Sequence, residues 1–337
     1  MILDGNDPAA IARAADILAA GGLLGLPTET VYGLAADADD AQAVGRIFEA
    51  KGRPSDHPLI VHLAPAARPG ELPPALSRYA ARVPDFAARL IHTFWPGPLT
   101  LILPRRSEHA AAAAGGQASV GLRCPSHPVA RAVLAACLSR GVSGLAAPSA
   151  NQFGRVSPTT AAHVAGEFDF DLPVLDGGPC QVGIESTIVD CSREVPVLLR
   201  PGAITVAQLA EACGQAVVPP ESLRTAAPRA SGTLESHYAP RAAVHLMDAA
   251  ALQAALDRRA ADAPPLALYA RSALRDSPAA AVQRRSMPAD AAAAAQELFA
   301  TLRDFDDLGV QAIWVETPPA DPAWDGVRDR LQRAAAT

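Results

Sequence analysis

The sequence contains no apolar run long enough to cross a membrane, and residues 1–4, MILD, lack the basic and apolar regions of a secretory signal. Its five cysteines are odd in number, and no two stand in a CxxC spacing. Neither a zinc site nor a disulfide framework is therefore predicted. The expected compartment is the cytoplasm, without membrane attachment.

Aromatic residues make up only 4% of the chain, and lysine is scarce while alanine, proline and arginine are abundant. The net charge of −6 argues against a broad nucleic-acid surface, so no stable nucleic-acid binding is expected. Half of the residues are hydrophobic, which is enough for sizeable cores, and a length of 337 residues predicts two domains.

The stretch from residue 21 to residue 63 organises the rest of the chain. Leu23 to Leu26 is a short apolar run ended by Pro27, which predicts a buried strand. The polar residues Thr28, Glu29 and Thr30 follow it directly. In open α/β sheets ligands bind at such strand ends, so these side chains are candidates for a site.

A helix and a basic loop are predicted next in this stretch. Asp39 is the expected N-cap, and Val44, Ile47 and Phe48 form the apolar face of the helix. Gly52 suits the helix end, and it is flanked by two cations, Lys51 and Arg53. Residues 58–63, PLIVHL, predict a second buried strand with His57 and His62 at its edges.

Further elements are predicted from periodicity and from capping and breaking residues. Expected helices are residues 7–21, two helices split by Pro84 and ending near Phe94, and residues 127–138, 159–166 and 206–213. Expected strands are residues 99–103, 119–125, 144–148, 174–176, 184–190 and 195–199. Residues 219–240 show no periodicity and are interpreted as a linker.

The C-terminal part alternates strand and helix patterns, which predicts a small parallel-sheet domain. The expected strands are residues 244–247, 266–269 and 310–315, and the expected helices are residues 249–261, 291–308 and 324–335. This part contains no glycine-rich phosphate loop and no cluster of catalytic residue types, so it predicts no reaction of its own.

Several short runs follow one another in a fixed order: PTETVYGL, KGRP, PLIVHL, VGLRCP, APSAN, ESTIVD and LRPG. In this order they resemble the YrdC-like family of threonylcarbamoyl-adenylate synthases. The linker ends in His237, Tyr238, Ala239 and Pro240, which resembles the His-Tyr-x-Pro segment of the family's longer, two-domain members.

The resemblance implies an α/β fold: a YrdC-like twisted mixed-sheet catalytic domain at residues 1–215, a linker or lid at 216–242, and a smaller Rossmann-like domain at 243–337. It implies a nucleotidyltransferase that joins L-threonine, bicarbonate or CO2, and ATP into threonylcarbamoyl-AMP and pyrophosphate. The product would pass to the machinery that transfers the threonylcarbamoyl group to tRNA. Mg2+ is expected with ATP, and Glu29 and Glu185 are the carboxylates considered for it.

The resemblance also implies roles for individual residues. Lys51 and Arg53 form the KxR motif and would act on the ATP phosphates as the catalytic pair. The other residues implied to bind ATP are His57, Ser119, Ser149, Asn151, Ser157, Arg200 and His237. Those implied to bind threonine are Thr30, His62, Arg123, Ala147 and Ser186. The chain departs from the family at His57, where asparagine is common, and before His237, where a basic residue is common.

Two other functions fit parts of the pattern. A module of the same fold that binds RNA without catalysis is disfavoured by the acidic balance and by the lack of aromatics among the basic residues. Carbamoyl transfer, as in hydrogenase-maturation proteins with a similar domain, is disfavoured because the Cys-rich zinc motifs of those chains are absent here.

Overall fold

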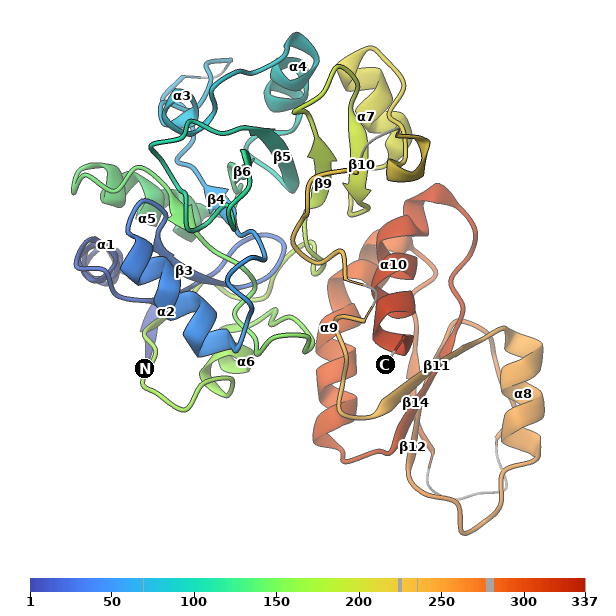
Figure 1. The fold of residues 1–337 in the computed structure, drawn as a ribbon. Helices are drawn as coiled ribbons and strands as arrows, with labels where there is room; N and C mark the ends of the chain where they lie inside the picture. The colour runs from blue at the N-terminus through green and yellow to red at the C-terminus, as the bar shows by residue number, and fades with distance from the viewer. Residues whose placement is uncertain (69, 224–225, 235, 277–281, 337) are drawn as a thin grey trace. The chain divides into compact units, whose positions relative to one another are not determined.

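The structure is a computed structural model that describes residues 1–337 except 69, 224–225, 235, 277–281 and 337. The chain divides into two compact units (Figure 1). The first contains Met1–Phe153 and Ser157–Thr233, and the second contains Gly154–Val156 and Leu234–Thr337. The expected boundaries at 1–215, 216–242 and 243–337 stay a prediction, and residues 69, 224–225, 235, 277–281 and 337 of those ranges lie outside the described part.

The first unit is built on a ten-stranded mixed sheet. Its strands are β1 (Ile2–Asp4), β2 (Leu24–Leu26), β3 (Gly33–Asp37), β4 (Ile60–His62), β5 (Leu99–Pro104), β6 (Ser119–Arg123), β7 (Leu145–Ala146), β8 (Val174–Asp176), β9 (Thr187–Asp190) and β10 (Val197–Arg200). They lie in the order β1-β8-β2-β3-β7-β4-β6-β5-β9-β10. The pairs β2-β3, β3-β7 and β7-β4 are antiparallel. From β4 to β10 the pairs alternate between parallel, such as β4 with β6, and antiparallel, such as β5 with β6.

Helices surround this sheet. They are α1 (Pro8–Ala19), α2 (Ala41–Lys51), α3 (Leu76–Tyr79), α4 (Asp85–Phe94), α5 (Pro128–Leu138), α6 (Ala161–Ala165) and α7 (Val206–Cys213), and a 3-10 turn, η1, follows at Pro220–Ser222. One apolar core cluster includes Ile47, Leu90 and Leu101, and a second includes Leu18 and Val133, where α1 packs against α5.

Three details of the first unit differ from the sequence-based expectation. Strands β1 and β3 were not predicted, because β1 has only three residues and β3 consists mainly of small residues, GLAAD. The N-cap of α2 is Asp40 and not Asp39, since the Asp40 carboxylate accepts from the backbone N–H groups of Gln42 and Ala43. Asp39 instead accepts a hydrogen bond from Arg78 at 2.8 Å, so its role is tertiary.

The second unit has a four-stranded parallel sheet in the order β11-β14-β12-β13. Its elements are β11 (Ala243–Met247), α8 (Ala249–Asp257), β12 (Leu266–Ala270), β13 (Val282–Ser286), α9 (Ala291–Asp307), β14 (Ala312–Glu316), a 3-10 turn η2 (Pro322–Trp324) and α10 (Asp325–Ala335). The predicted pairing of a mixed-sheet domain with a smaller parallel α/β domain is confirmed. Strand β13 was missed because its sequence, VQRRS, is an exposed edge without apolar alternation.

No helix in the described part of the chain is both long and apolar enough to cross a membrane.

Candidate active site

The first part of the site is the C-terminal end of α2. Val44, Ile47, Phe48 and Lys51 are spaced at i, i+3, i+4 and i+7, so the lysine shares the buried face of the helix. Its side chain is only 2% exposed. Gly52 ends the helix in the left-handed conformation, with φ of 59°, which lets the chain turn away after the lysine.

Lys51 joins two sequence motifs. Its Nζ donates a hydrogen bond to the carbonyl of Ser149 at 2.6 Å and another to the carbonyl of Asn151. Burial, together with the nearby charge of Arg53, lowers the pKa of Lys51 to about 7. Because Lys51 is the only lysine in the sequence, this is also the only side-chain amine of the protein.

Phe153, which was not predicted as a site residue, lies beside Arg53. The guanidinium of Arg53 lies 5.7 Å from the ring centroid of Phe153, and the ring of His57 meets the same phenyl ring edge-on at 5.5 Å. The backbone N–H of Phe153 donates to the carbonyl of Lys51 at 2.9 Å. Phe153 stands two residues after Asn151, and that position was the only sequence signal for it.

Strand register brings the candidate threonine-binding residues into a row. Across β4, β6 and β5, His62 pairs with Arg123 and Arg123 pairs with Thr100, so these three side chains emerge on one face of the sheet. Ser186 directly precedes β9, which pairs with β5. Ala147 directly follows β7, which pairs with β4. Strand order, rather than nearness in sequence, therefore assembles this pocket.

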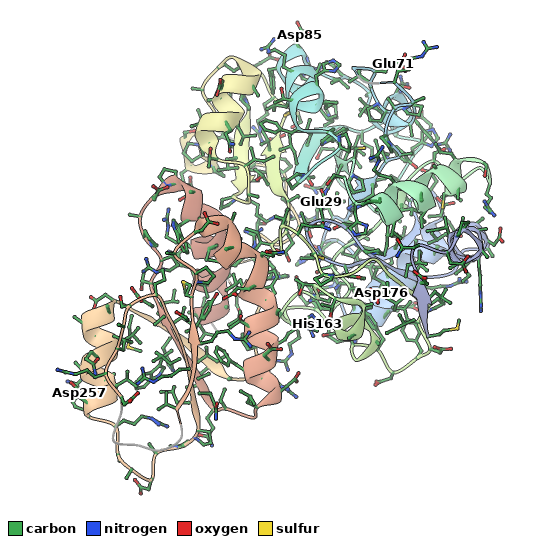
Figure 2. The ribbon with its side chains drawn as sticks, turned by 180° about the vertical axis from the view of Figure 1, so that it is seen from behind. Glu29, Glu71, Asp85, His163, Asp176 and Asp257 are labelled. Carbon is green, nitrogen blue, oxygen red and sulfur yellow. The ribbon has the colours of Figure 1, made fainter. Side chains whose placement is uncertain are left out.

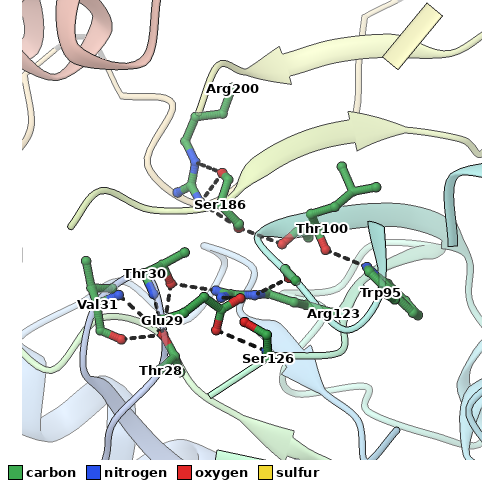
Figure 3. Close-up of polar contacts among 12 residues, drawn as sticks. Thr28, Glu29, Thr30, Val31, Trp95, Thr100, Arg123, Ser126, Ser186 and Arg200 are labelled. Atoms are coloured by element: carbon green, nitrogen blue, oxygen red, sulfur yellow. Dashed lines mark hydrogen bonds and ion pairs between the residues drawn. The ribbon is translucent and has the colours of Figure 1, made fainter. Parts of the chain in front are cut away.

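Arg123 is the centre of the row and is 4% exposed. Its guanidinium pairs with the carboxylate of Glu29 at 2.7 Å, and it donates to the hydroxyl of Thr30 at 2.8 Å and to the carbonyl of Gly97 at 3.3 Å. Figure 3 shows Glu29 and Thr30 on one side of Arg123. Since a guanidinium carries five N–H groups, these contacts leave donors for a ligand carboxylate.

The charges in this pocket follow from burial and from Arg123. Figure 2 shows Glu29 in the interior of the first unit, whereas Asp85 lies at its periphery. Burial raises the pKa of Glu29, but the charge and hydrogen bond of Arg123 outweigh it, so the net pKa is lowered and the carboxylate is ionised. Burial, followed by repulsion from Arg123, lowers the pKa of His62 to about 3, so its imidazole is neutral.

A second arginine, Arg200, contacts Ser186 of this row. Arg200 donates from Nε and Nη2 to the carbonyl of Ser186 at 3.0 and 2.9 Å. The Ser186 hydroxyl in turn lies 2.7 Å from that of Thr100, as Figure 3 shows. Thr100 was not predicted as a site residue, because a threonine inside an apolar strand has no local signal.

The linker residue Ser231 contacts both arginines that were predicted to bind phosphates. Its carbonyl accepts from Arg200 at 2.9 Å, and its hydroxyl lies 3.5 Å from Nη2 of Arg53. A small, shallow cleft lies here, and Ser119, Gln117, Arg229 and Ser231 are among its lining residues. The segment expected to be a linker or lid therefore contacts two residues that were predicted to bind ATP.

Ser157 and Glu185 connect the two candidate subsites. The Ser157 hydroxyl is fully buried and donates to the carboxylate of Glu185, the residue before Ser186. Glu29 is likewise engaged, by Arg123 and by the backbone N–H of Ser126 at 3.2 Å. In the described part of the chain no three His, Cys, Asp or Glu side chains are grouped so as to hold a metal ion.

The structure thus brings together Lys51, Arg53, His57, Ser149 and Asn151 in one group and Thr30, His62, Arg123, Ala147 and Ser186 in another. Ser119 lines the cleft near Ser231, Arg200 donates to the Ser231 carbonyl, and Ser157 donates to the Glu185 carboxylate. The remaining candidate, His237, belongs to the second unit, where its ring meets that of Tyr238 at 4.1 Å.

Fold and site together define a class: a two-domain α/β protein whose mixed sheet gathers buried arginines, hydroxyl groups and one lysine, as binding of an anionic substrate requires. Comparison with known proteins narrows this class. Residues 16–202 match the family model of Sua5, YciO and YrdC, described as telomere recombination, and residues 204–336 match the threonylcarbamoyl-AMP synthase C-terminal domain. The chain belongs to the Sua5–YciO–YrdC family, in its long two-domain form.

Individual relatives agree with this assignment. The threonylcarbamoyl-AMP synthase of Bacillus subtilis is 43% identical over 245 residues, which are 71% of this chain and 67% of that protein. The synthase of Pyrococcus abyssi is 40% identical over 70% of this chain and 67% of its own length. The structure of Pyrococcus abyssi Sua5 complexed with L-threonine matches over 99% of this chain and 97% of that chain, with a TM-score of 0.88 at 32% identity. The family resemblance inferred from the sequence is confirmed.

Proposed function

We propose that this chain makes L-threonylcarbamoyl-AMP and pyrophosphate from L-threonine, CO2 or bicarbonate, and ATP. It is a threonylcarbamoyl-AMP synthase, a nucleotidyltransferase, as are its relatives at 43% and 40% identity. The observation that carries the assignment of substrates to residues is the buried row of Thr30, Arg123 and Ser186, flanked by the cations Lys51, Arg53 and Arg200.

Threonine would bind along the row. Its carboxylate would accept the remaining N–H groups of Arg123, because a planar guanidinium matches a carboxylate in a bidentate contact. Its hydroxyl would meet polar partners among Thr30, the neutral His62 and Ser186, which excludes amino acids that lack it. Ala147 would form the apolar wall. A threonine complex of the Pyrococcus abyssi protein supports this choice of amino acid.

The reaction needs two bond-forming steps. The threonine amine attacks the carbon of CO2, which bicarbonate supplies by taking up a proton and losing water, and the amine gives up a proton as the carbamate forms. A carbamate oxygen then attacks the α-phosphorus of ATP, and the bond to the β-phosphate oxygen breaks as pyrophosphate leaves. Displacement of this kind depends mainly on alignment and charge stabilisation, so it requires no side-chain nucleophile.

The ATP phosphates would be held by Lys51, Arg53 and Arg200, and the nucleoside by His57, Ser119, Ser149, Asn151, Ser157 and His237. Mg2+ would enter as part of the magnesium–ATP substrate, because the nearby carboxylates Glu29 and Glu185 already have partners. The product would then pass to the machinery that transfers the threonylcarbamoyl group to tRNA.

The direct test is pyrophosphate release from ATP, measured with and without threonine and bicarbonate, with mass spectrometry of the nucleotide product. Release that requires both co-substrates, together with a threonylcarbamoyl-AMP mass, is expected. Release without threonine, or an equal rate with serine and valine, would contradict the proposed threonine pocket.

A further inference from the structure

Contacts around Thr30 fix the direction in which its hydroxyl proton points. The neighbouring Thr28 hydroxyl is buried and lies 2.6 Å from the carbonyl of Val31, which can only accept, so Thr28 donates to it. The hydroxyls of Thr28 and Thr30 lie 2.9 Å apart, so the proton between them comes from Thr30 (Figure 3). Thr30 also accepts from Nη1 of Arg123 at 2.8 Å. Toward a ligand, Thr30 therefore presents a lone pair and no proton.

The hydroxyl of Ser186 is fixed in the opposite sense. Its oxygen accepts from Nη2 of Arg200 at 3.2 Å and lies 2.7 Å from the hydroxyl of Thr100. Thr100 is fully buried in the otherwise apolar strand β5, and among the described residues its hydroxyl has no other hydrogen-bond partner. Because a buried donor without an acceptor is costly, Thr100 donates to Ser186. Both lone pairs of Ser186 are then occupied, so Ser186 presents a proton to a ligand.

Strand register places this acceptor and this donor beside Arg123. Thr100 pairs with Arg123 across β5 and β6, and with Ile188 across β5 and β9. Ser186 stands two residues before Ile188, so its side chain returns to the face that carries Thr100. Thr30 contacts the guanidinium of Arg123 directly. A hydroxyl group can donate to Thr30 and accept from Ser186 at once, whereas a methyl group in its place satisfies neither.

We propose that Thr28 and Thr100 are positioning residues that set the hydrogen-bond polarity of the amino-acid pocket and so its preference for a substrate with a hydroxyl group. Thr28 acts through Thr30, which it makes an acceptor, and Thr100 acts through Ser186, which it makes a donor. The threonine hydroxyl would then donate to Thr30 and accept from Ser186, while the threonine carboxylate binds Arg123. The inference rests on the proposed function in taking this pocket as the threonine site.

The test compares threonine with valine, which has nearly the same shape but a methyl group in place of the hydroxyl. Dissociation constants of the full-length chain for both amino acids are measured by calorimetry in wild type, Thr100→Val and Thr100→Ser. Thr100→Val leaves the Ser186 proton without a fixed direction, so the threonine constant should rise about two- to tenfold, the range for the loss of one hydrogen bond. The valine constant should stay within about twofold, because valine does not use that proton. Thr100→Ser keeps the hydroxyl and should restore the wild-type ratio of the two constants.

Thr28→Val removes the acceptor for the Thr30 proton, so it should lower the same preference, and it decides the question if Thr100→Val does not fold. Thr187→Val is the matched control, because Thr187 is equally buried in β9 but its hydroxyl bonds the backbone of Ile204. Its ratio of threonine to valine constants should equal that of wild type. An unchanged ratio in the folded Thr100→Val or Thr28→Val variant, or equal weakening of both amino acids, would overturn the inference. A wild-type protein without any preference for threonine would instead refute the proposed threonine pocket.

Discussion

Lys51 differs from an ordinary surface lysine in both position and charge. It stands on the apolar face of α2, and its amine is surrounded by the carbonyls of Ser149 and Asn151 and by the charge of Arg53. Carbonyls stabilise an ammonium, whereas burial and a neighbouring cation disfavour it, and the second pair of effects dominates. A bound phosphate group would stabilise the ammonium and so raise the pKa of Lys51.

We therefore predict that Lys51 titrates near pH 7 in the free protein and at higher pH with ATP bound. Because the chain has a single lysine, carbon-13 labelling of lysine gives one side-chain signal whose chemical shift can be followed between pH 5 and 11. ATP affinity should fall as pH rises through 7, since the bound state prefers the ammonium. A free-protein titration near the usual 10.5 would contradict the prediction.

Folding stability changes with pH in the opposite direction to ATP affinity: it rises as Lys51 loses its proton. The folded-state pKa of Lys51 lies below its unfolded value, so the unfolded chain binds the proton more tightly between about pH 7 and 10.5. The buried ammonium destabilises the fold most below pH 7, and this destabilisation decreases as the pH rises from about 7 to 10.5. Lys51→Met should therefore stabilise the protein at pH 6 while removing ATP binding, which thermal denaturation and calorimetry measure separately.

Substitution of Arg123 tests the proposed threonine pocket. Arg123→Ala should weaken threonine binding by about 2–5 kcal/mol, because the substrate carboxylate would be buried without its partner, while ATP binding changes little. The variant also leaves Glu29 buried without its cation, so its carboxyl pKa should rise. Arg131→Ala, an exposed arginine on α5, is the control. Equal losses for both substrates would indicate a shared site or misfolding.

At the scale of elements, the linker is more than a connector. Ser231 contacts Arg53 and Arg200, and the neighbouring Arg229 pairs with Asp56 and donates to the carbonyl of Gly115. ATP phosphates that bind the same two arginines must compete with Ser231 or share them with it. The expectation that the linker is a lid stays a prediction, and its moving part would be residues near 229–231 rather than the buried Tyr238.

The prediction for this element uses Arg229→Ala. An exposed ion pair is a weak restraint, so its loss should speed thermolysin cleavage before Leu234 by only about two- to fivefold in the absence of ATP. With ATP bound, wild type and variant should be protected alike. Arg82→Ala removes another exposed pair, with Glu194, and should leave cleavage unchanged. Equal cleavage of wild type, Arg229→Ala and Arg82→Ala would show that Arg229 does not hold the linker in place.

The elements also show where sequence reasoning succeeds and where it stops. Helix α2 followed from the apolar spacing of Val44, Ile47 and Phe48, and strands β5 and β6 followed from their apolar runs. Strand β3 did not, since GLAAD becomes a strand only through pairing with β2 and β7. The Lys51 and Arg123 motifs were visible in sequence, but Phe153, Thr100 and Ser231 join the site through tertiary contacts that no local pattern encodes.

At the scale of the whole molecule, the two units have separate apolar cores. The clusters around Ile47 and around Val133 lie in the first unit, and the smaller one around Leu252 and Leu268 lies in the second. Each unit therefore has a core of its own on which it can fold. The threonine-binding candidates all lie within the first unit, whereas one ATP candidate, His237, belongs to the second.

A fragment of residues 1–218 separates these dependencies. Val218 is a suitable end, because its backbone pairs with Pro196 and Leu198 beside β10 and the cut leaves that pairing intact. The fragment should unfold cooperatively and bind threonine within about threefold of the full chain, a difference below 1 kcal/mol. Its ATP affinity should fall by about tenfold or more, since loop 154–156 loses Arg303 and the cleft loses Ser231. Calorimetry with each ligand and a thermal melt measure all three quantities. A soluble, cooperatively folded fragment without threonine affinity would mean that the amino-acid pocket needs the second unit as well, and the division of labour between the units would be wrong.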